Sequence, residues 1–310
     1  MMGLGAQGDG WVINRGEDGY PRMLEDLSDP PARIYGRGRL SALVEPCFAI
    51  VGTRRITPYG AALCELAAKL AVESGLTVVS GGAIGCDQVA GRAALDAGGV
   101  HIVVLGTGAD VVYPARSGPL IELALARGGA VISLEPWGMG PRRYAFPKRN
   151  RVIAALSQAV FVAEAGMPSG TFSTAEVAGA IGRELLVAPG SVFSAESRGT
   201  NYLIEAGATI IPDEEALSCA ISRIYETLRT QALGHTKPVG ATAEEREAIR
   251  VLTATPLRAD EVARALSLDT RACLELLSAL SVQSLVERTV DGRYAASSIA
   301  LAAQTSFGAQ

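Results

Sequence analysis

Short runs of continuous apolar residues alternate with helix-like segments through the middle of the chain. The runs lack polar residues at every second position, which is typical of strands buried on both faces of a sheet. Between them lie helical patterns, over residues 60–74, 87–97 and 173–181. Alternating strands and helices predict an α/β fold with a doubly wound, mostly parallel sheet. The expected strands are 48–51, 77–79, 102–105, 131–134, 160–163, 185–188 and 209–211.

The turns at the ends of these strands are rich in glycine. The carboxyl ends of parallel strands meet at one edge of an open sheet, where ligands bind. Glycine lets a ligand approach the backbone, and free N–H groups at helix starts favour phosphate. We therefore expect a phosphate-bearing ligand at this edge, although tight strand-to-helix turns also need glycine by themselves. The turns are residues 52–55, 80–82, 106–108, 135–136, 164–166 and 189–191.

A second pattern follows a loop-like stretch that contains glycine and proline and reads as a linker. Thr242 and Glu245 have the spacing of a capping box, and three helical patterns and a hairpin around Asp291-Gly292 come after it. These elements predict a small C-terminal winged-helix domain, with helices over 243–252, 258–266 and 270–281. The expected organisation is a lead-in (1–45), a Rossmann-like domain (46–229), a linker (230–241), the winged-helix domain (242–296) and a disordered tail (297–310).

The last helix of the small domain is poor in positive charge. It carries Arg271 as its one cation and also contains Glu275. A helix that reads the major groove of duplex DNA needs side chains that contact phosphates and bases. We therefore favour a structural or protein-interaction role for this domain over duplex reading.

Composition narrows the class of protein. Apolar residues make up 48% of the 310-residue chain, charged residues 19%, and the net charge is −4. No apolar run approaches the roughly 20 residues that span a bilayer, and the first ten residues lack the pattern of a signal peptide. Five scattered cysteines and two distant histidines offer neither metal spacing nor a disulfide framework. We expect a cytoplasmic protein that contacts no membrane and holds no metal.

One basic cluster stands out against this acidic balance. Residues 142–151 contain five cations and no acid, with the aromatic Phe146 among them. Such a patch favours a phosphate-bearing partner, and an aromatic ring beside it is a surface on which a base can stack. A solvent-exposed helix start, whose cations are balanced by acidic residues elsewhere in the chain, explains the same cluster equally well from this segment alone.

The familiar cofactor fingerprints do not fit. The first turn, from Gly52 to Gly60, lacks the Gly-x-Gly-x-x-Gly spacing, and Val111 stands where Gly106-Thr107-Gly108 would need a third glycine. No Gly-x-x-x-x-Gly-Lys-Ser/Thr is present either. The sequence therefore predicts a Rossmann-like scaffold without a bound cofactor, with Arg54 and Arg55 in its first loop.

Several motifs follow one another in a fixed order over roughly residues 20–212. They are Gly52-Thr53-Arg54-Arg55, Pro58-Tyr59-Gly60, Ser80-Gly81, Gly106-Thr107-Gly108, Tyr113-Pro114, Phe146-Pro147-Lys148-Arg149-Asn150-Arg151, Ser169-Gly170-Thr171 and Ala188-Pro189-Gly190-Ser191. This ordered set resembles the DNA-processing protein A family (DprA, also called Smf).

The resemblance implies a single-stranded-DNA-binding recombination mediator. Family members protect incoming DNA in natural transformation, load the RecA recombinase onto it, form homodimers and have no attributed catalysis. Two positions depart from the family pattern, because Ile84 and Gly91 stand where members often carry arginine and histidine. The DNA-binding residues that the resemblance and the turns together predict are Gly52, Thr53, Arg54, Arg55, Gly81, Gly106, Thr107, Phe146, Lys148, Asn150, Arg151, Ser169, Gly170 and Thr171.

An enzyme remains the alternative. The stretch from Ser169 to Glu176 is similar to a motif of phosphoribohydrolases that act on nucleoside monophosphates on a related scaffold, but Glu176 is displaced by two positions from its expected place. Glu135 and Glu164 follow strands that we take as neighbours, and could form a carboxylate pair for acid–base chemistry. Beside Lys148 and Arg151 they are better explained as carboxylates that orient those cations. We therefore expect no catalytic residues.

Overall fold

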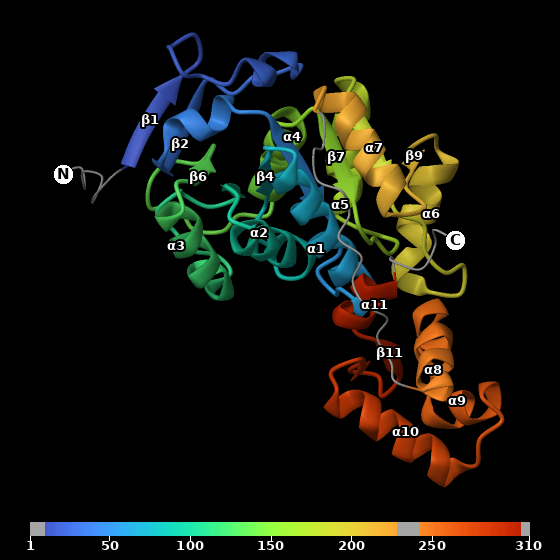
Figure 1. The fold of residues 1–310 in the computed structure, drawn as a ribbon. Helices are drawn as coiled ribbons and strands as arrows, with labels where there is room; N and C mark the ends of the chain where they lie inside the picture. Colours follow the sequence, from blue (N-terminus) through green and yellow to red (C-terminus); the bar gives the residue numbers. More distant parts are fainter. Residues whose placement is uncertain (1–9, 228–241, 305–310) are drawn as a thin grey trace.

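The computed structural model describes residues 10–227 and 242–304, and its centre is a nine-stranded sheet (Figure 1). The strand order is β1-β2-β6-β5-β4-β3-β7-β8-β9, and all pairs from β6 to β9 are parallel. The predicted mostly parallel, doubly wound sheet is thus confirmed. Its parallel strands are β3 (Cys47–Val51), β4 (Thr77–Ser80), β5 (His101–Leu105), β6 (Ala130–Ser133), β7 (Ala159–Val162), β8 (Glu184–Val187) and β9 (Thr209–Ile210).

Burial explains why these strands read as continuous apolar runs. Every residue of β3, β4, β5, β6 and β7 is buried, because helices cover both faces of the sheet. One face packs on α1 (Pro58–Glu73), α2 (Cys86–Asp96), α3 (Gly118–Ala126) and α7 (Glu214–Tyr225). The other packs on α4 (Ala145–Ala155), α5 (Thr171–Ala180) and α6 (Arg198–Glu205).

The direction in which the sheet grows reverses at β3. From β3 the chain adds β4, β5 and β6 on one side, and then returns to place β7 on the other side of β3. In open α/β sheets such a switch point opens a crevice at the carboxyl ends of the two strands. The loops after β3 and β7 therefore flank the expected ligand position.

The lead-in adds two strands to the same sheet. β1 (Gly10–Asn14) pairs antiparallel with β2 (Arg33–Gly38), which pairs antiparallel with β6. Gly36 is required at this crossing, because a Cβ there would lie 2.2 Å from the Trp11 ring. The lead-in is thus part of the main layer, and its two strands were absent from the sequence prediction.

The C-terminal part contains three helices and a two-stranded hairpin. They are α8 (Ala243–Ala254), α9 (Ala259–Ala265), α10 (Thr270–Val282), β10 (Val286–Arg288) and β11 (Tyr294–Ala296). The capping box of Thr242 and Glu245 is present, as predicted. These elements agree with the expected ones, while their assignment as a winged helix stays a prediction. The predicted linker, 230–241, lies outside the described residues.

The expectation of a disordered tail over 297–310 is wrong for its first part. Residues Ser298–Gln304 form helix α11, which lies against α1 of the larger part (Figure 1). The Ser297 hydroxyl accepts the Ala300 N–H, and Ala300 is buried in the core of the C-terminal part. The tail is rich in small residues and has no clear period, which is why composition alone suggested that it is unstructured.

Candidate functional site

A cleft of about 400 Å³ lies where the strand order reverses. We call it the strand-end cleft. Its walls are the loop after β3, the loop that precedes α5 and one face of α4. Nine of the predicted site residues line it: Gly52, Thr53, Arg54, Arg55, Phe146, Asn150, Ser169, Gly170 and Thr171.

The loop after β3 is held rigidly at its backbone. The Thr53 N–H donates to the Glu164 carbonyl at 2.7 Å, and the Thr53 carbonyl accepts the Cys86 N–H at 3.1 Å. Gly85 has φ +93°, and a Cβ there would lie 2.3 Å from the Thr53 oxygen. The side chains of Arg54 and Arg55 are exposed. A fixed backbone with two exposed cations is suited to hold phosphates without reorganisation.

Behind this loop lies a buried arginine. Arg149 exposes 6% of its surface, and its guanidinium donates to the carbonyls of Gly81 and Val104. Asp87 is buried beside it and accepts the N–H groups of Gly81 and Ala83 at 3.1 and 3.3 Å. Burial raises the pKa of Asp87, and the Arg149 charge acts against that shift. Arg149 therefore ties the ends of β4 and β5 to α4.

Three predicted site residues support the cleft and do not line it. Gly81 makes room for Arg149, and Gly106 for the Phe146 ring, which lies 2.9 Å from where a Gly106 Cβ would be. Thr107 is buried, and its hydroxyl donates to the Val111 carbonyl at 2.7 Å. These residues shape the turns on which the lining side chains rest.

The start of α5 forms the opposite wall. The Thr171 N–H donates to the Ser169 hydroxyl oxygen at 3.2 Å, and the two hydroxyls lie 3.0 Å apart. Asn150 on α4 donates to the Ser173 hydroxyl at 2.8 Å. Hydroxyls and helix-start N–H groups that face a cleft are suited to contact phosphate oxygens.

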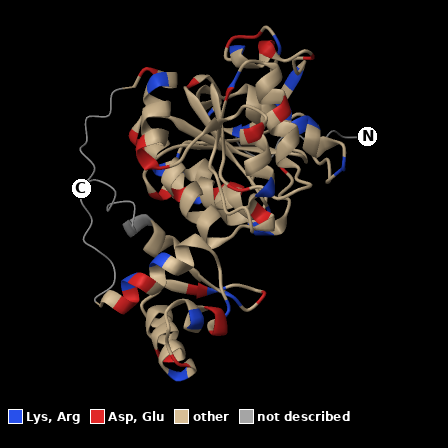
Figure 2. Ribbon diagram, turned by 90° about the vertical axis from the view of Figure 1, so that its right-hand side faces the viewer, with Lys and Arg blue, Asp and Glu red and all other residues tan. Residues whose placement is uncertain are grey.

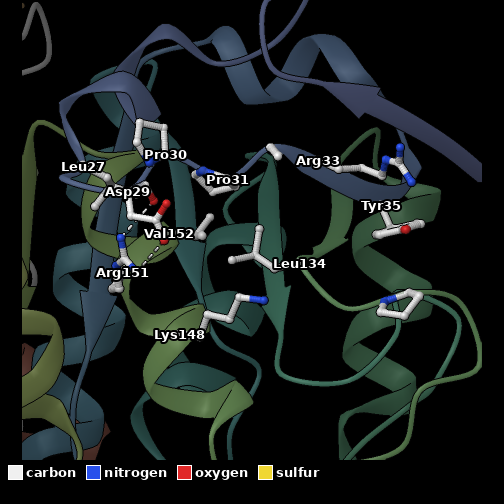
Figure 3. Close-up of a pocket in the computed structure, with 12 residues that line it drawn as sticks. Leu27, Asp29, Pro30, Pro31, Arg33, Tyr35, Leu134, Lys148, Arg151 and Val152 are labelled. Carbon is white, nitrogen blue, oxygen red and sulfur yellow. Dashed lines mark hydrogen bonds and ion pairs between the residues drawn. The ribbon is translucent and has the colours of Figure 1, made fainter.

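Lys148 and Arg151 lie on the other side of α4. The structure does not bring them together with Arg54, because residues three apart on a helix share a face and Phe146 and Asn150 lie on the opposite one. Lys148 Nζ is 3.2 Å from Glu135 Oε1. Figure 3 shows Arg151 beside Asp29, to whose carbonyl it donates at 2.9 Å. The basic cluster is thus divided between two surfaces.

The prediction for Glu135 and Glu164 is half right. Glu135 pairs with Lys148, as expected. The role predicted for Glu164 is wrong, since its carboxylate accepts the Thr57 N–H at 2.9 Å and the Thr57 hydroxyl at 2.7 Å at the start of α1. The two carboxylates cannot form a pair, because β5, β4 and β3 lie between β6 and β7. Burial raises the pKa of Glu164.

The carboxylate that the enzyme alternative would use, that of Glu176, does not lie in the strand-end cleft. Glu176 is exposed on α5, and it is absent from the residues that line the strand-end cleft. Among the residues of 10–227 and 242–304, no group of three or more His, Cys, Asp or Glu could hold a metal ion. No helix in these ranges is long and apolar enough to cross a bilayer.

The departure at Gly91 has a packing reason. A Cβ at this position of α2 would lie 2.5 Å from His101 Nε2. The His101 ring is fully buried on β5, with Nδ1 2.9 Å from the Val78 carbonyl, and burial lowers its pKa to about 4. An imidazole from β5 therefore fills the space beside α2. The other departure, Ile84, is 40% exposed.

Substitution of Gly91 by alanine is expected to lower the free energy of unfolding by about 1–3 kcal/mol, because overpacking a closed core has this cost. Urea unfolding measures it. His101→Ala should be destabilising alone and should remove most of the additional effect of Gly91→Ala, as a double-mutant cycle would show. Equal effects of Gly91→Ala in both backgrounds would contradict the contact.

Charge is mixed over the molecule. Figure 2 shows acidic and basic positions interspersed along the ribbon in both parts of the chain. Attraction of an anion therefore depends on local groups such as Arg54 and Arg55, and less on the net charge of −4.

Solved structures similar to this chain include two of DNA processing protein A. The Streptococcus pneumoniae structure superimposes with a TM-score of 0.62 at 36% identity, over 67% of this chain and 73% of that one. The Helicobacter pylori structure, described for its single-stranded DNA binding mode, has a TM-score of 0.63 at 30% identity, over 69% of this chain and 96% of that one.

Sequence relatives agree. Protein Smf of Escherichia coli K12 is 38% identical over 198 residues, which are 64% of this chain and 53% of that protein. DNA processing protein DprA of Streptococcus pneumoniae R6 is 39% identical over 63% of this chain and 68% of that protein. The matched part spans about half the length of the Smf relatives, at 53% and 52%. Residues 11–222 match the family described as DNA recombination-mediator protein A, and the chain therefore belongs to that family.

Proposed function

We propose that the chain binds single-stranded DNA in the strand-end cleft, without strong sequence preference. The observation that carries the proposal is the meeting, in one cleft, of two exposed arginines, a helix start and an aromatic ring, namely Arg54, Arg55, Thr171 and Phe146. Single-strand binders combine cations that follow the backbone with rings on which bases stack. The Helicobacter pylori protein of this family, which has a similar fold, supports the same ligand class.

Each cleft group has a separate task in this proposal. Arg54 and Arg55 neutralise phosphates, and the N–H and hydroxyl groups of residues 169–171 position the backbone. The Phe146 ring is fixed by its packing on Gly106 and by Tyr113, whose ring centroid is 6.0 Å away. A ring held in place loses little entropy when a base stacks on it.

The resemblance to the family supports the wider role. We infer that the chain acts in the cytoplasm as a homodimer that protects single-stranded DNA in transformation and delivers it to the RecA recombinase, without catalysis or a cofactor. The C-terminal part is assigned a structural or protein-interaction role as a winged helix. Arg271 of α10 is consistent with this, because it is paired with Glu275 at 2.9 Å and so offers little net charge to duplex DNA.

A titration of a labelled thymidine oligonucleotide, followed by fluorescence anisotropy at several salt concentrations, tests the proposal. We expect binding that weakens with salt, with a slope of about −0.7 per phosphate contact, and poor competition by duplex. Equal competition by duplex, or no binding at low salt, would overturn it. Release of a free base from a nucleoside monophosphate would support the enzyme alternative instead.

A further inference from the structure

A second hollow lies between α4 and the lead-in, on the side of α4 away from the strand-end cleft. We call this hollow of about 440 Å³ the lead-in groove. Its walls come from seven of the residues 27–35 and from Leu134, Pro136, Lys148, Arg151 and Val152 (Figure 3). The volume is within the range of small-molecule sites, about 300–1,000 Å³.

Three cations from two elements line the lead-in groove. Arg33 is exposed at the start of β2, and its Nε donates to Asn14 at 2.9 Å, which leaves its two Nη groups without a hydrogen-bond partner among the described residues. The Lys148 and Arg151 side chains are 45% and 30% exposed. The Asp29 carboxylate is 3.9 Å from Arg151 Nη1, which is a long ion pair, and the Asp29 side chain is 89% exposed. Donors therefore remain available to an anion.

The same groove has an aromatic and apolar wall. Tyr35 packs edge to face on Trp137, with centroids 5.6 Å apart and planes at 82°. The pairing of β2 with β6 sets Tyr35 opposite Ser133, one residue before Leu134. Cations beside a fixed aromatic and apolar wall have the chemistry of a nucleotide site, since phosphate and base need different partners.

Residues near the start of α4 contribute to both hollows, since Phe146 lines the strand-end cleft and Lys148 the lead-in groove. Tyr144 is 58% exposed there, and its hydroxyl donates to Glu135 Oε2 at 3.5 Å. Glu135 also holds Lys148 of the lead-in groove, while Phe146, two residues after Tyr144, lines the strand-end cleft. Through Glu135, an exposed aromatic side chain is therefore held near Lys148 of the lead-in groove.

We propose that the lead-in groove is a second nucleotide subsite, which binds further nucleotides of the strand held in the strand-end cleft. This inference rests on the proposed function, because it extends the path of the same ligand. Arg33 and Lys148 contact phosphates, and Tyr35 supports a base. The lead-in thus contributes directly to DNA binding and sets the length of strand that one chain covers.

Binding of thymidine oligonucleotides of increasing length, from about 4 to about 16 nucleotides, tests the proposal over the range of site sizes known for single-strand-binding domains. Arg33→Glu and Tyr35→Leu should leave the affinity for the shortest oligonucleotide within about twofold, yet weaken the longest at least about fivefold. Lys148→Gln should also reduce the magnitude of the salt slope for the long oligonucleotide by about 0.7.

The controls separate this proposal from the function on which it rests. Arg127→Glu makes the same charge change at the end of α3. Because Arg127 precedes the start of β6, it lies at the amino ends of the parallel strands, away from the lead-in groove at their carboxyl ends. It should change neither affinity. Tyr35→Leu keeps an apolar contact with Trp137, and circular dichroism verifies its fold. The subsite would be overturned if Arg33→Glu and Tyr35→Leu lowered the affinity for long and short oligonucleotides equally, or lowered neither affinity. Weaker binding of both the short and the long oligonucleotide by Phe146→Ala would instead report on the strand-end cleft, and so on the proposed function.

Discussion

Replacement of Arg149 by methionine is expected to lower the free energy of unfolding by about 3–5 kcal/mol, because removal of one partner from buried charged groups leaves the others uncompensated. Methionine fills similar space but cannot donate to the carbonyls of Gly81 and Val104. The buried Asp87 carboxylate would also lose the positive charge that most opposes the effect of burial on its pKa. Urea unfolding followed by circular dichroism measures the change.

Two further variants test whether this loss comes from charge. Asp87→Asn in the Arg149→Met background should recover part of the stability, since the orphaned carboxylate is gone. Lys148→Met, one residue earlier on α4, removes a cation whose side chain is 45% exposed, and should change the free energy of unfolding by less than about 1 kcal/mol. A loss in Arg149→Met no larger than that in Lys148→Met would contradict the assigned role.

The parallel sheet could be predicted because its signal is local. Each buried strand shows itself as an apolar run, and the helices between them have their own period, so no knowledge of partners is needed. The two strands of the lead-in lack that signal. In β2 the buried positions, Ile34 and Gly36, alternate with more exposed ones, and the strand contains two glycines. Its partner β6 is about a hundred residues away along the chain. Local pattern does not reveal such a pairing.

The strand-end cleft was predictable for a different reason. In an open parallel sheet the carboxyl-end turns converge at one edge, so their glycines and arginines could be assigned to one site before the order of strands was known. The order itself is not local information. This is why Glu135 and Glu164 were taken as neighbours, although three strands lie between their own.

The division of the basic cluster was available from the sequence and was missed. Positions 146 and 150 are four apart, and 148 and 151 three apart, so a helix over this segment separates the two pairs. A cluster of cations counted along the chain says nothing of the faces on which they lie. What the sequence could not show is the partner of the second face, because the lead-in reaches it through the tertiary fold.

Phe146→Ala and Arg54→Gln are expected to weaken single-stranded DNA binding in distinguishable ways. Loss of the ring removes base stacking, worth about 1–3 kcal/mol, and should leave the salt slope unchanged. Loss of the Arg54 charge should weaken binding about tenfold or more and reduce the magnitude of the slope by about 0.7, as one phosphate contact releases its counterions. Arg54→Gln is preferable to a charge reversal, because a carboxylate at this position would repel phosphates in addition to removing the contact.

These two signatures together locate the strand in the cleft. Anisotropy titrations of an oligonucleotide of about 4–6 nucleotides give both quantities, and the short length keeps the lead-in groove out of the measurement. Phe193→Ala is the matched control, since this phenylalanine is 91% exposed and does not line the cleft. Because stacking and charge act through different terms, a change in slope with Phe146→Ala, or an unchanged slope with Arg54→Gln, would show that the strand does not lie between these two side chains.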